Sequence, residues 1–316
     1  MMLHKKDIEE LWRVTKMSNI NINDIKILRD KTSAGMSDCK EALKQCGGDI
    51  ESAAKYLREK GLSNAQKKID KEAKEGVIIA HIEEKSAAMV ALNCESDFVA
   101  RSSRFQVLAE KLVLLAHRNN SNDLDSFKRS DDNVNSSIEE TIMNEVMVLK
   151  EKINLSEICY LDVKDGVVAG YVHSSIPSSE DASFYGNVPP IFGKIGALVA
   201  LESKGDKEKL KALGKQLAIH IASMKPKALS VDHLDQKELE SERLKITEDV
   251  KKLGKPEKVM ENIISGRIAK YYEEVVLLEQ FFLGEKIKVA DLIKLSEAEL
   301  NCTINLVDYK LFTICS

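Results

Sequence analysis

The chain has 316 residues, of which 43% are hydrophobic, 31% are charged and 5% are aromatic, so it has room for two or three helix-rich domains. Its 47 basic and 51 acidic residues give a net charge of -4, and this near balance argues against direct nucleic-acid binding through a broad basic surface. The apolar runs are shorter than the ~20 residues that cross a bilayer, so we expect no membrane partner.

Residues 1–21 form an N-terminal extension that mixes acidic and basic side chains. Signal peptides need an apolar core and transit peptides avoid acids, so the acids between positions 7 and 10 favour the bacterial cytoplasm over an organelle. Met17 opens a second start sequence. Residues 1–16 are therefore either an alternative-start extension, which we favour, or a short amphipathic helix.

Residues 22–62 have the apolar spacing of three short helices. Ser37 or Asp38 can cap the second helix and Asp49 the third, because their side-chain oxygens accept hydrogen bonds from the first turn. Gly61 is expected to end the third helix. These helices predict a small bundle that would be only marginally stable alone.

A charged linker, residues 63–75, separates this module from a core that we divide into residues 76–165 and 166–316. The first part predicts, in order, a hairpin (77–82 and 87–92), a helix (102–118), a mobile polar loop (119–137) and a helix (138–152). A second hairpin, of residues 156–163 and 167–172, is predicted across the boundary between the two parts. The rest of the second part has the patterns, in order, of an insertion loop (174–193), a strand (194–201), a helix (207–223), an antiparallel helical hairpin (235–275) and a final strand (303–314).

The core contains a short internal repeat. Met-Val-Ala-Leu at residues 89–92 resembles Leu-Val-Ala-Leu at residues 198–201, and an acid follows each, at Asp97 and Asp206. Each acid precedes a helical pattern. The repeat predicts a duplicated unit of hairpin and helix, and therefore an α+β core of two related halves.

The most informative segment is the polar turn between the strand that ends near Leu92 and the helix that follows. It presents an acid, Asp97, beside an aromatic ring, Phe98. A phenyl ring on a turn either folds back into the core or contacts a partner. The pattern alone leaves both alternatives open.

Motifs of catalysis and cofactor binding are absent from the sequence. It has no P-loop, no GxGxxG after a strand, and no GxSxG, HExxH or HRD. The six histidines form no pair at metal-ligand spacing, and the six cysteines form no CxxC pair. We therefore expect no catalytic residues, no cofactor and no metal site, and we interpret the cysteines as core residues of a reducing compartment.

Several ordered motifs together resemble the elongation factor Ts family. The first signature lies at residues 25–43, and the second is Asn-Cys-Glu-Ser-Asp-Phe-Val-Ala at residues 93–100. Shorter matches follow in the family's order at residues 170–173, 220–222, 254–256 and 265–267. The resemblance extends over about residues 22–315.

The resemblance implies an N-terminal three-helix module like a ubiquitin-associated domain, then two α+β subdomains with a projecting helical hairpin. It also implies a guanine-nucleotide exchange factor, not an enzyme, whose partner is elongation factor Tu in its GDP-bound and nucleotide-free forms. In the family, the turn matched by Ser96, Asp97, Phe98 and Val99 enters the partner's G domain and dislocates the nucleotide-bound magnesium. The family usually has Thr where this chain has Ser96.

Three further residues match family positions that contact the partner: His173, on the strand of the second half, and Arg29 and Met36, in the helical module. From pattern alone, the ordinary strand histidine is the favoured interpretation of His173. Arg29 is equally an ordinary surface charge, and Met36 an ordinary core thioether. His220, on an apolar helix, we interpret as a core residue.

Two other classes of function remain as alternatives. One is a three-helix adaptor that binds other proteins without exchange activity. The other is a hydrolase or transferase with residues far apart in the sequence. The sequence does not decide whether the chain forms a homodimer.

Overall fold

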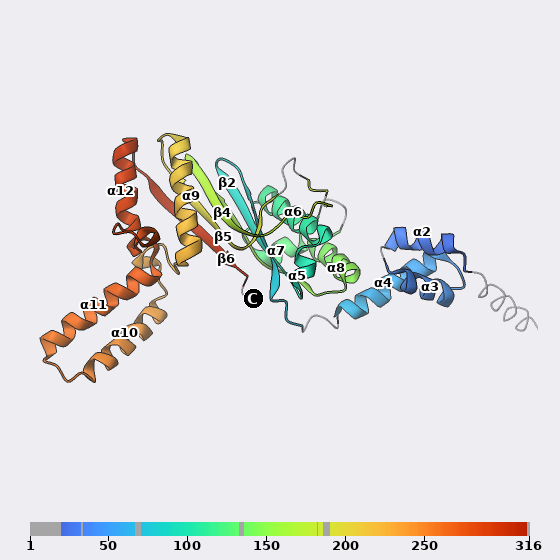
Figure 1. Cartoon of the computed structure of the whole chain (residues 1–316), viewed down its shortest axis with the longest axis horizontal. Coiled ribbons are helices and arrows are strands. Elements are labelled where there is room, and N and C mark those ends of the chain that lie inside the picture. Colours follow the sequence, from blue (N-terminus) through green and yellow to red (C-terminus); the bar gives the residue numbers. More distant parts are fainter. Residues whose placement is uncertain are drawn as a thin grey trace, which may run out of the picture.

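A computed structural model of the chain describes residues 20–32, 34–66, 71–132, 136–181, 183–185 and 190–314. Most of the N-terminal extension, including Met17, lies outside these residues. Figure 1 shows three helices at one end of an elongated molecule, a central sheet with helices beside it, and a pair of helices that projects from the other end. The fold is α+β, as predicted from the sequence.

The helical module consists of α2 (Ile22–Thr32), α3 (Met36–Gln45) and α4 (Ile50–Gln66) around a small apolar core. Asp49 caps α4 as predicted, since its carboxylate accepts a hydrogen bond from Ser52 N at 2.8 Å. The predicted caps of α3 are wrong, because its N-cap is Gly35, which has no side chain.

Gly61 does not end the third helix as predicted, because α4 continues to Gln66. A Cβ atom at this position would lie 2.6 Å from Met147 Sδ on α8 (Ile138–Leu149). The glycine therefore permits close approach of α4 to the core. Asp38 and Lys150 add an ion pair of 2.9 Å between the module and the core.

One six-stranded antiparallel sheet forms the centre of the core. Its strands are β1 (Glu75–Ile82), β2 (Ser86–Cys94), β3 (Ile153–Asp162), β4 (Gly166–Ile176), β5 (Phe192–Glu202) and β6 (Asn305–Thr313). The hairpin of β1 and β2 is confirmed. The second predicted hairpin is wrong, because β3 pairs with β2 and β4 pairs with β5.

The helices of the core lie outside the sheet. After β2 come α5 (Asp97–Ala100), α6 (Ser103–Arg118), α7 (Leu124–Arg129) and α8; after β5 come α9 (Lys207–Met224), α10 (Gln236–Lys251), α11 (Glu257–Val275) and α12 (Val289–Leu300). The predicted polar loop 119–137 therefore contains a helix, which buries Phe127. The pair α10–α11 forms the projecting hairpin (Figure 1). Within the described part of the chain, none of the helices combines the length and apolar character that a membrane span requires.

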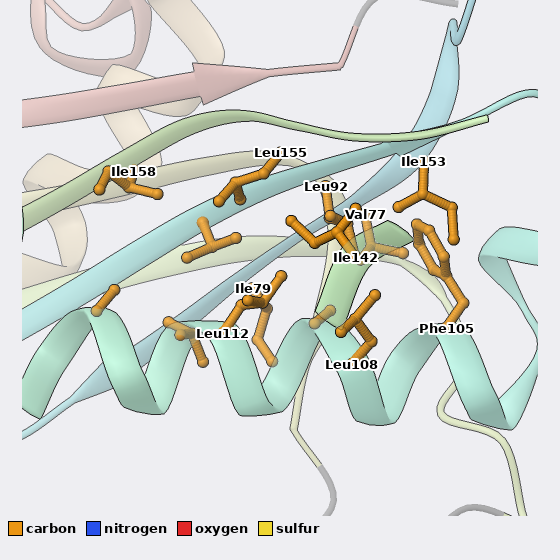
Figure 2. Packing of buried hydrophobic residues seen from close by; sticks show 14 of the residues in the cluster. Val77, Ile79, Leu92, Phe105, Leu108, Leu112, Ile142, Ile153, Leu155 and Ile158 are labelled. Carbon is orange, nitrogen blue, oxygen red and sulfur yellow. The ribbon is translucent and has the colours of Figure 1, made fainter. Parts of the chain in front are cut away.

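Apolar side chains cover both faces of the central strands, and one of these faces joins the two halves. In β2, Ala88, Val90 and Leu92 face α6 and α8, where Figure 2 shows Leu92 near Phe105 and Leu108 of α6. The alternate side chains of β2 face a second layer, shared with β4, β5 and β6, that includes Met89, Leu198 and Phe312. We call this cluster the shared layer. The sheet curls around the shared layer, because β3 also contacts β5 and β6.

The internal repeat is visible in the backbone. The register of β2 against β3 shifts between Ala91 and Leu92, and that of β5 against β6 shifts between Ala200 and Leu201. Each half also begins with a glycine at positive φ, at 145° for Gly76 and 141° for Gly166. The segments that resemble one another in sequence are therefore the equivalent central strands of two similar units.

Replacement of Gly76 by alanine should reduce the stability of the fold. A Cβ atom there would lie 2.2 Å from the carbonyl oxygen of Leu92, on a backbone conformation that L-residues rarely adopt. We expect Gly76→Ala to lower the free energy of unfolding by about 2–4 kcal/mol in urea denaturation. Gly266→Ala is the control, because this position in α11 has open space and alanine favours a helix by about 0.5–1 kcal/mol. Equal stability of the two variants would contradict the prediction.

His220 is a buried core residue, as the sequence predicts. Its Nδ1 accepts a hydrogen bond from Leu283 N at 3.0 Å, and its Nε2 lies 3.0 Å from Gln280 Oε1. These partners require a neutral ring with the proton on Nε2. Burial lowers the pKa of His220, although the hydrogen bond with Gln280 opposes this effect.

Acid should therefore destabilise the fold through His220. Because its pKa is lower in the folded chain than the ~6.5 of an exposed histidine, the unfolded chain binds the proton first as the pH falls. The stabilisation that neutral His220 provides is complete above the pKa of the unfolded chain. It is lost progressively as the pH falls from that pKa through the pKa of the folded chain. We expect urea denaturation between about pH 7.5 and pH 5 to show a smaller loss for His220→Gln than for the native chain. The variant should still lose some stability in acid, because burial also lowers the pKa of His117. Equal losses of unfolding free energy in the variant and the native chain would contradict the role of His220.

Candidate functional site

The turn at residues 96–99 exposes an aromatic side chain from a well-packed element. Phe98 is 81% exposed, the largest exposure of any large hydrophobic side chain in the described residues. Ala100, in the same turn of helix, is buried, and Val99 packs against the core under α6. The ring is therefore not folded into the core, which was one of the two alternatives that the sequence left open.

Glu151 holds the start of this turn. Its carboxylate accepts hydrogen bonds from Ser96 N at 2.9 Å and from Ser96 Oγ at 2.6 Å. The same hydroxyl oxygen accepts from Val99 N at 3.4 Å and caps α5. Thr and Ser both supply this hydroxyl, so the geometry is compatible with the residue that is usual in the family. Sequence reasoning missed Glu151, because an acid between a helix and a strand has no distinctive local pattern.

The residues next to Ser96 and Glu151 form a second, reciprocal contact, in which the acid belongs to the turn segment and the backbone N–H belongs to the segment after α8. Glu95 accepts a hydrogen bond from Lys152 N at 2.6 Å and forms a 2.6 Å ion pair with Lys71. The thiol of Cys94 donates to Ser96 O at 3.1 Å. Burial raises the pKa of Cys94 to about 12, so the thiol stays protonated. The turn is thus anchored on both sides before Asp97 and Phe98 project from it.

The insertion after β4 supports the other end of the turn. Gln106 is fully buried, and its amide nitrogen donates to Ala100 O at 3.4 Å and Pro177 O at 3.0 Å. Its amide oxygen accepts from Ser179 N at 2.7 Å. Through this side chain, the predicted insertion 174–193 contacts the base of the turn; residues 182 and 186–189 of it lie outside the described set.

Asp97 lies beside Phe98 with its carboxylate half exposed. It forms an ion pair with Arg101, at 3.7 Å between Oδ2 and Nε. Such an exposed ion pair contributes little to stability. The acid is therefore accessible to a partner, next to an apolar ring.

The other predicted site residues lie elsewhere on the surface. His173 is exposed on β4, where its Nδ1 lies 2.9 Å from Tyr171 Oη. Arg29 and Met36 are exposed on α2 and α3, Met36 by 59%. The structure keeps Ser96 to Val99 together and distributes the other three over separate elements (Figure 1). An extended surface of this kind suits contact with a macromolecule better than enclosure of a small substrate.

Comparison with known proteins identifies the family. The family model described as Elongation factor TS matches residues 95–314 and so begins at the turn. A protein named elongation factor Ts from Wolbachia sp. subsp. Brugia malayi is 46% identical over 298 residues, which cover 94% of this chain and 99% of the relative. The chain belongs to the elongation factor Ts family. The elongation factor Ts of Ehrlichia chaffeensis is 45% identical over 296 residues, with 93% and 99% coverage. Membership of the elongation factor Ts family gives the chain a role in translation elongation.

Removal of the Glu151 carboxylate should loosen the turn. Glu151→Ala leaves Ser96 N without an acceptor, and a lost hydrogen bond to a charged group weakens a local structure by about 1–3 kcal/mol. We expect hydrogen exchange of the Ser96 amide to accelerate about tenfold or more, measured by NMR. Glu139→Ala, at an exposed position on α8, is the control. Unchanged protection of Ser96 in Glu151→Ala would mean that other contacts fix the turn.

Proposed function

We propose that this chain binds elongation factor Tu in its GDP-bound form and promotes release of GDP. The turn of Ser96 to Val99 enters the partner's G domain, where Asp97 and Phe98 displace elements that hold the nucleotide-bound magnesium. The nucleotide-free complex then accepts GTP. The observation that carries this proposal is the 81% exposure of Phe98 on an anchored turn.

The energetics suit such a role. Nanomolar binding of GDP corresponds to about -12 kcal/mol, so unaided release is slow. A protein accelerates release when it binds the nucleotide-free state more tightly than the GDP state. Burial of one phenyl ring contributes roughly 2–3 kcal/mol, which corresponds to about a hundredfold, and the wider surface supplies the rest. No residue of the chain needs to make or break a covalent bond.

The other predicted residues extend the proposed surface. His173 contacts the same partner from β4, and Arg29 and Met36 contact its G domain from the helical module. Exposure of all three side chains supports this proposal. The proposed complex forms in the bacterial cytoplasm, without direct contact to nucleic acid or membrane.

The alternative, an adaptor without exchange activity, uses the three-helix module alone. This alternative does not explain why Phe98, which lies outside the three-helix module, is exposed. The two functions differ in a simple experiment, because a fragment of residues 1–62 would retain the adaptor's binding, whereas exchange requires the turn.

Phe98→Ala should reduce exchange while leaving the fold intact, because the exposed ring contributes little to the core. We expect the acceleration of GDP release to fall about tenfold or more, and further in Asp97→Ala/Phe98→Ala. The measurement is stopped-flow release of a fluorescent GDP analogue from bacterial elongation factor Tu.

Tyr185→Ala provides a matched control, since it removes another aromatic ring that is 62% exposed. Thermal denaturation of each variant checks its fold. Normal exchange by Phe98→Ala would exclude the proposed role of the ring. Failure of the native chain to accelerate release would favour the adaptor.

A further inference from the structure

A second cluster of polar side chains lies at the opposite end of α6 from the turn. His81 is near the end of β1, Glu83 follows that strand, and His117 is in the last turn of α6. The spacing of these residues in the sequence predicts no metal site, but the fold brings one possible ligand atom of each within 4.8 Å of the other two.

The geometry of this cluster is close to that of a metal site. His81 Nε2 lies 3.5 Å from Glu83 Oε1, and the rings of His81 and His117 meet edge to face with centroids 4.8 Å apart. Zinc binds imidazole nitrogen at roughly 2.0–2.1 Å, so ligands on one ion lie roughly 3–4 Å apart. The side chains of His81 and Glu83 are 34% and 59% exposed, so both have space to rotate toward a common ion.

Neighbouring groups orient His117. Ser86 Oγ lies 2.9 Å from its Nε2, and the ring of Tyr160 lies 5.7 Å away, centroid to centroid. Such outer contacts fix the orientation of a ligating histidine. His117 also lies at the carboxyl end of a sixteen-residue helix, where the peptide dipoles favour a positive charge.

We propose that His81, Glu83 and His117 bind one divalent transition-metal ion of the zinc type. Two imidazoles and a carboxylate form a ligand set that zinc accepts, with water at the fourth position. The ion links the β1–β2 hairpin to the end of α6. It therefore stabilises the half of the core that also carries the turn, without a part in the proposed exchange.

Calorimetric titration of the full chain with zinc chloride in a non-chelating buffer tests the proposal. We expect one equivalent to bind, and the affinity to fall about tenfold or more in His81→Gln and in Glu83→Gln. His233→Gln is the matched control, because His233 is exposed and distant in the sequence. At the same zinc concentration, the Tm of the native chain and of the control should rise more than that of His81→Gln.

Cobalt(II) spectra separate this site from binding at thiols. Cobalt held by nitrogen and oxygen ligands lacks the thiolate charge-transfer band, and its visible absorption should disappear in His81→Gln. A thiolate band, equal affinity in His81→Gln and the native chain, or no saturable binding would each overturn the proposal. None of these results bears on release of GDP, so the two proposals fail independently.

Discussion

Burial of β2 and β5 on both faces is the constraint on which the core depends. One face of each strand contacts the helices of its own half, and the other enters the shared layer between the halves. Direct pairing of the halves involves Ile78 and Ile79 of β1 with Gly193 and Phe192 of β5. The shared layer therefore provides much of the attraction between the halves, and it explains why both central strands are continuous apolar runs.

The two halves differ at the place where the turn projects. In the second half, Asp206 follows β5 and directly caps α9, accepting from Lys209 N at 3.0 Å. In the first half, the corresponding Asp97 begins the four-residue helix α5, and α6 starts only after it. One added turn of helix thus converts a capping position into a projecting one. The proposed recognition element is a local addition to a duplicated scaffold.

Local patterns predicted much of this structure. Hydrophobic spacing located the helical module, the first hairpin and α6, and the short repeat identified the related central strands. Pairing of β3 and β4 was predicted wrongly, because two apolar runs around Asp165-Gly166 have the local signature of a hairpin while contacts distant in the sequence decide their partners. Phe127 illustrates the same limit of local patterns. The segment around it is polar and was predicted as a loop, but this one side chain is buried and holds α7 against the core.

The exposed residues of the candidate site could be predicted from the sequence, but the residue that holds the turn in place could not. The Asp97-Phe98 pair is a contiguous motif, so the sequence reveals it. Glu151 lies 55 residues from Ser96, and only the fold brings them together. The same reason hides the cluster of His81 and His117, whose members have no spacing that distinguishes them from dispersed histidines.

The anchoring of Phe98 has a kinetic consequence. A ring that is already exposed needs no opening step before it meets a partner, so the encounter rate would be limited by diffusion and orientation and not by rearrangement of this chain. In the exchange proposed above, the slow steps would then belong to the partner, whose G domain would rearrange to admit the ring. With an anchored turn on this chain, any conformational change that binding requires would occur in the other protein.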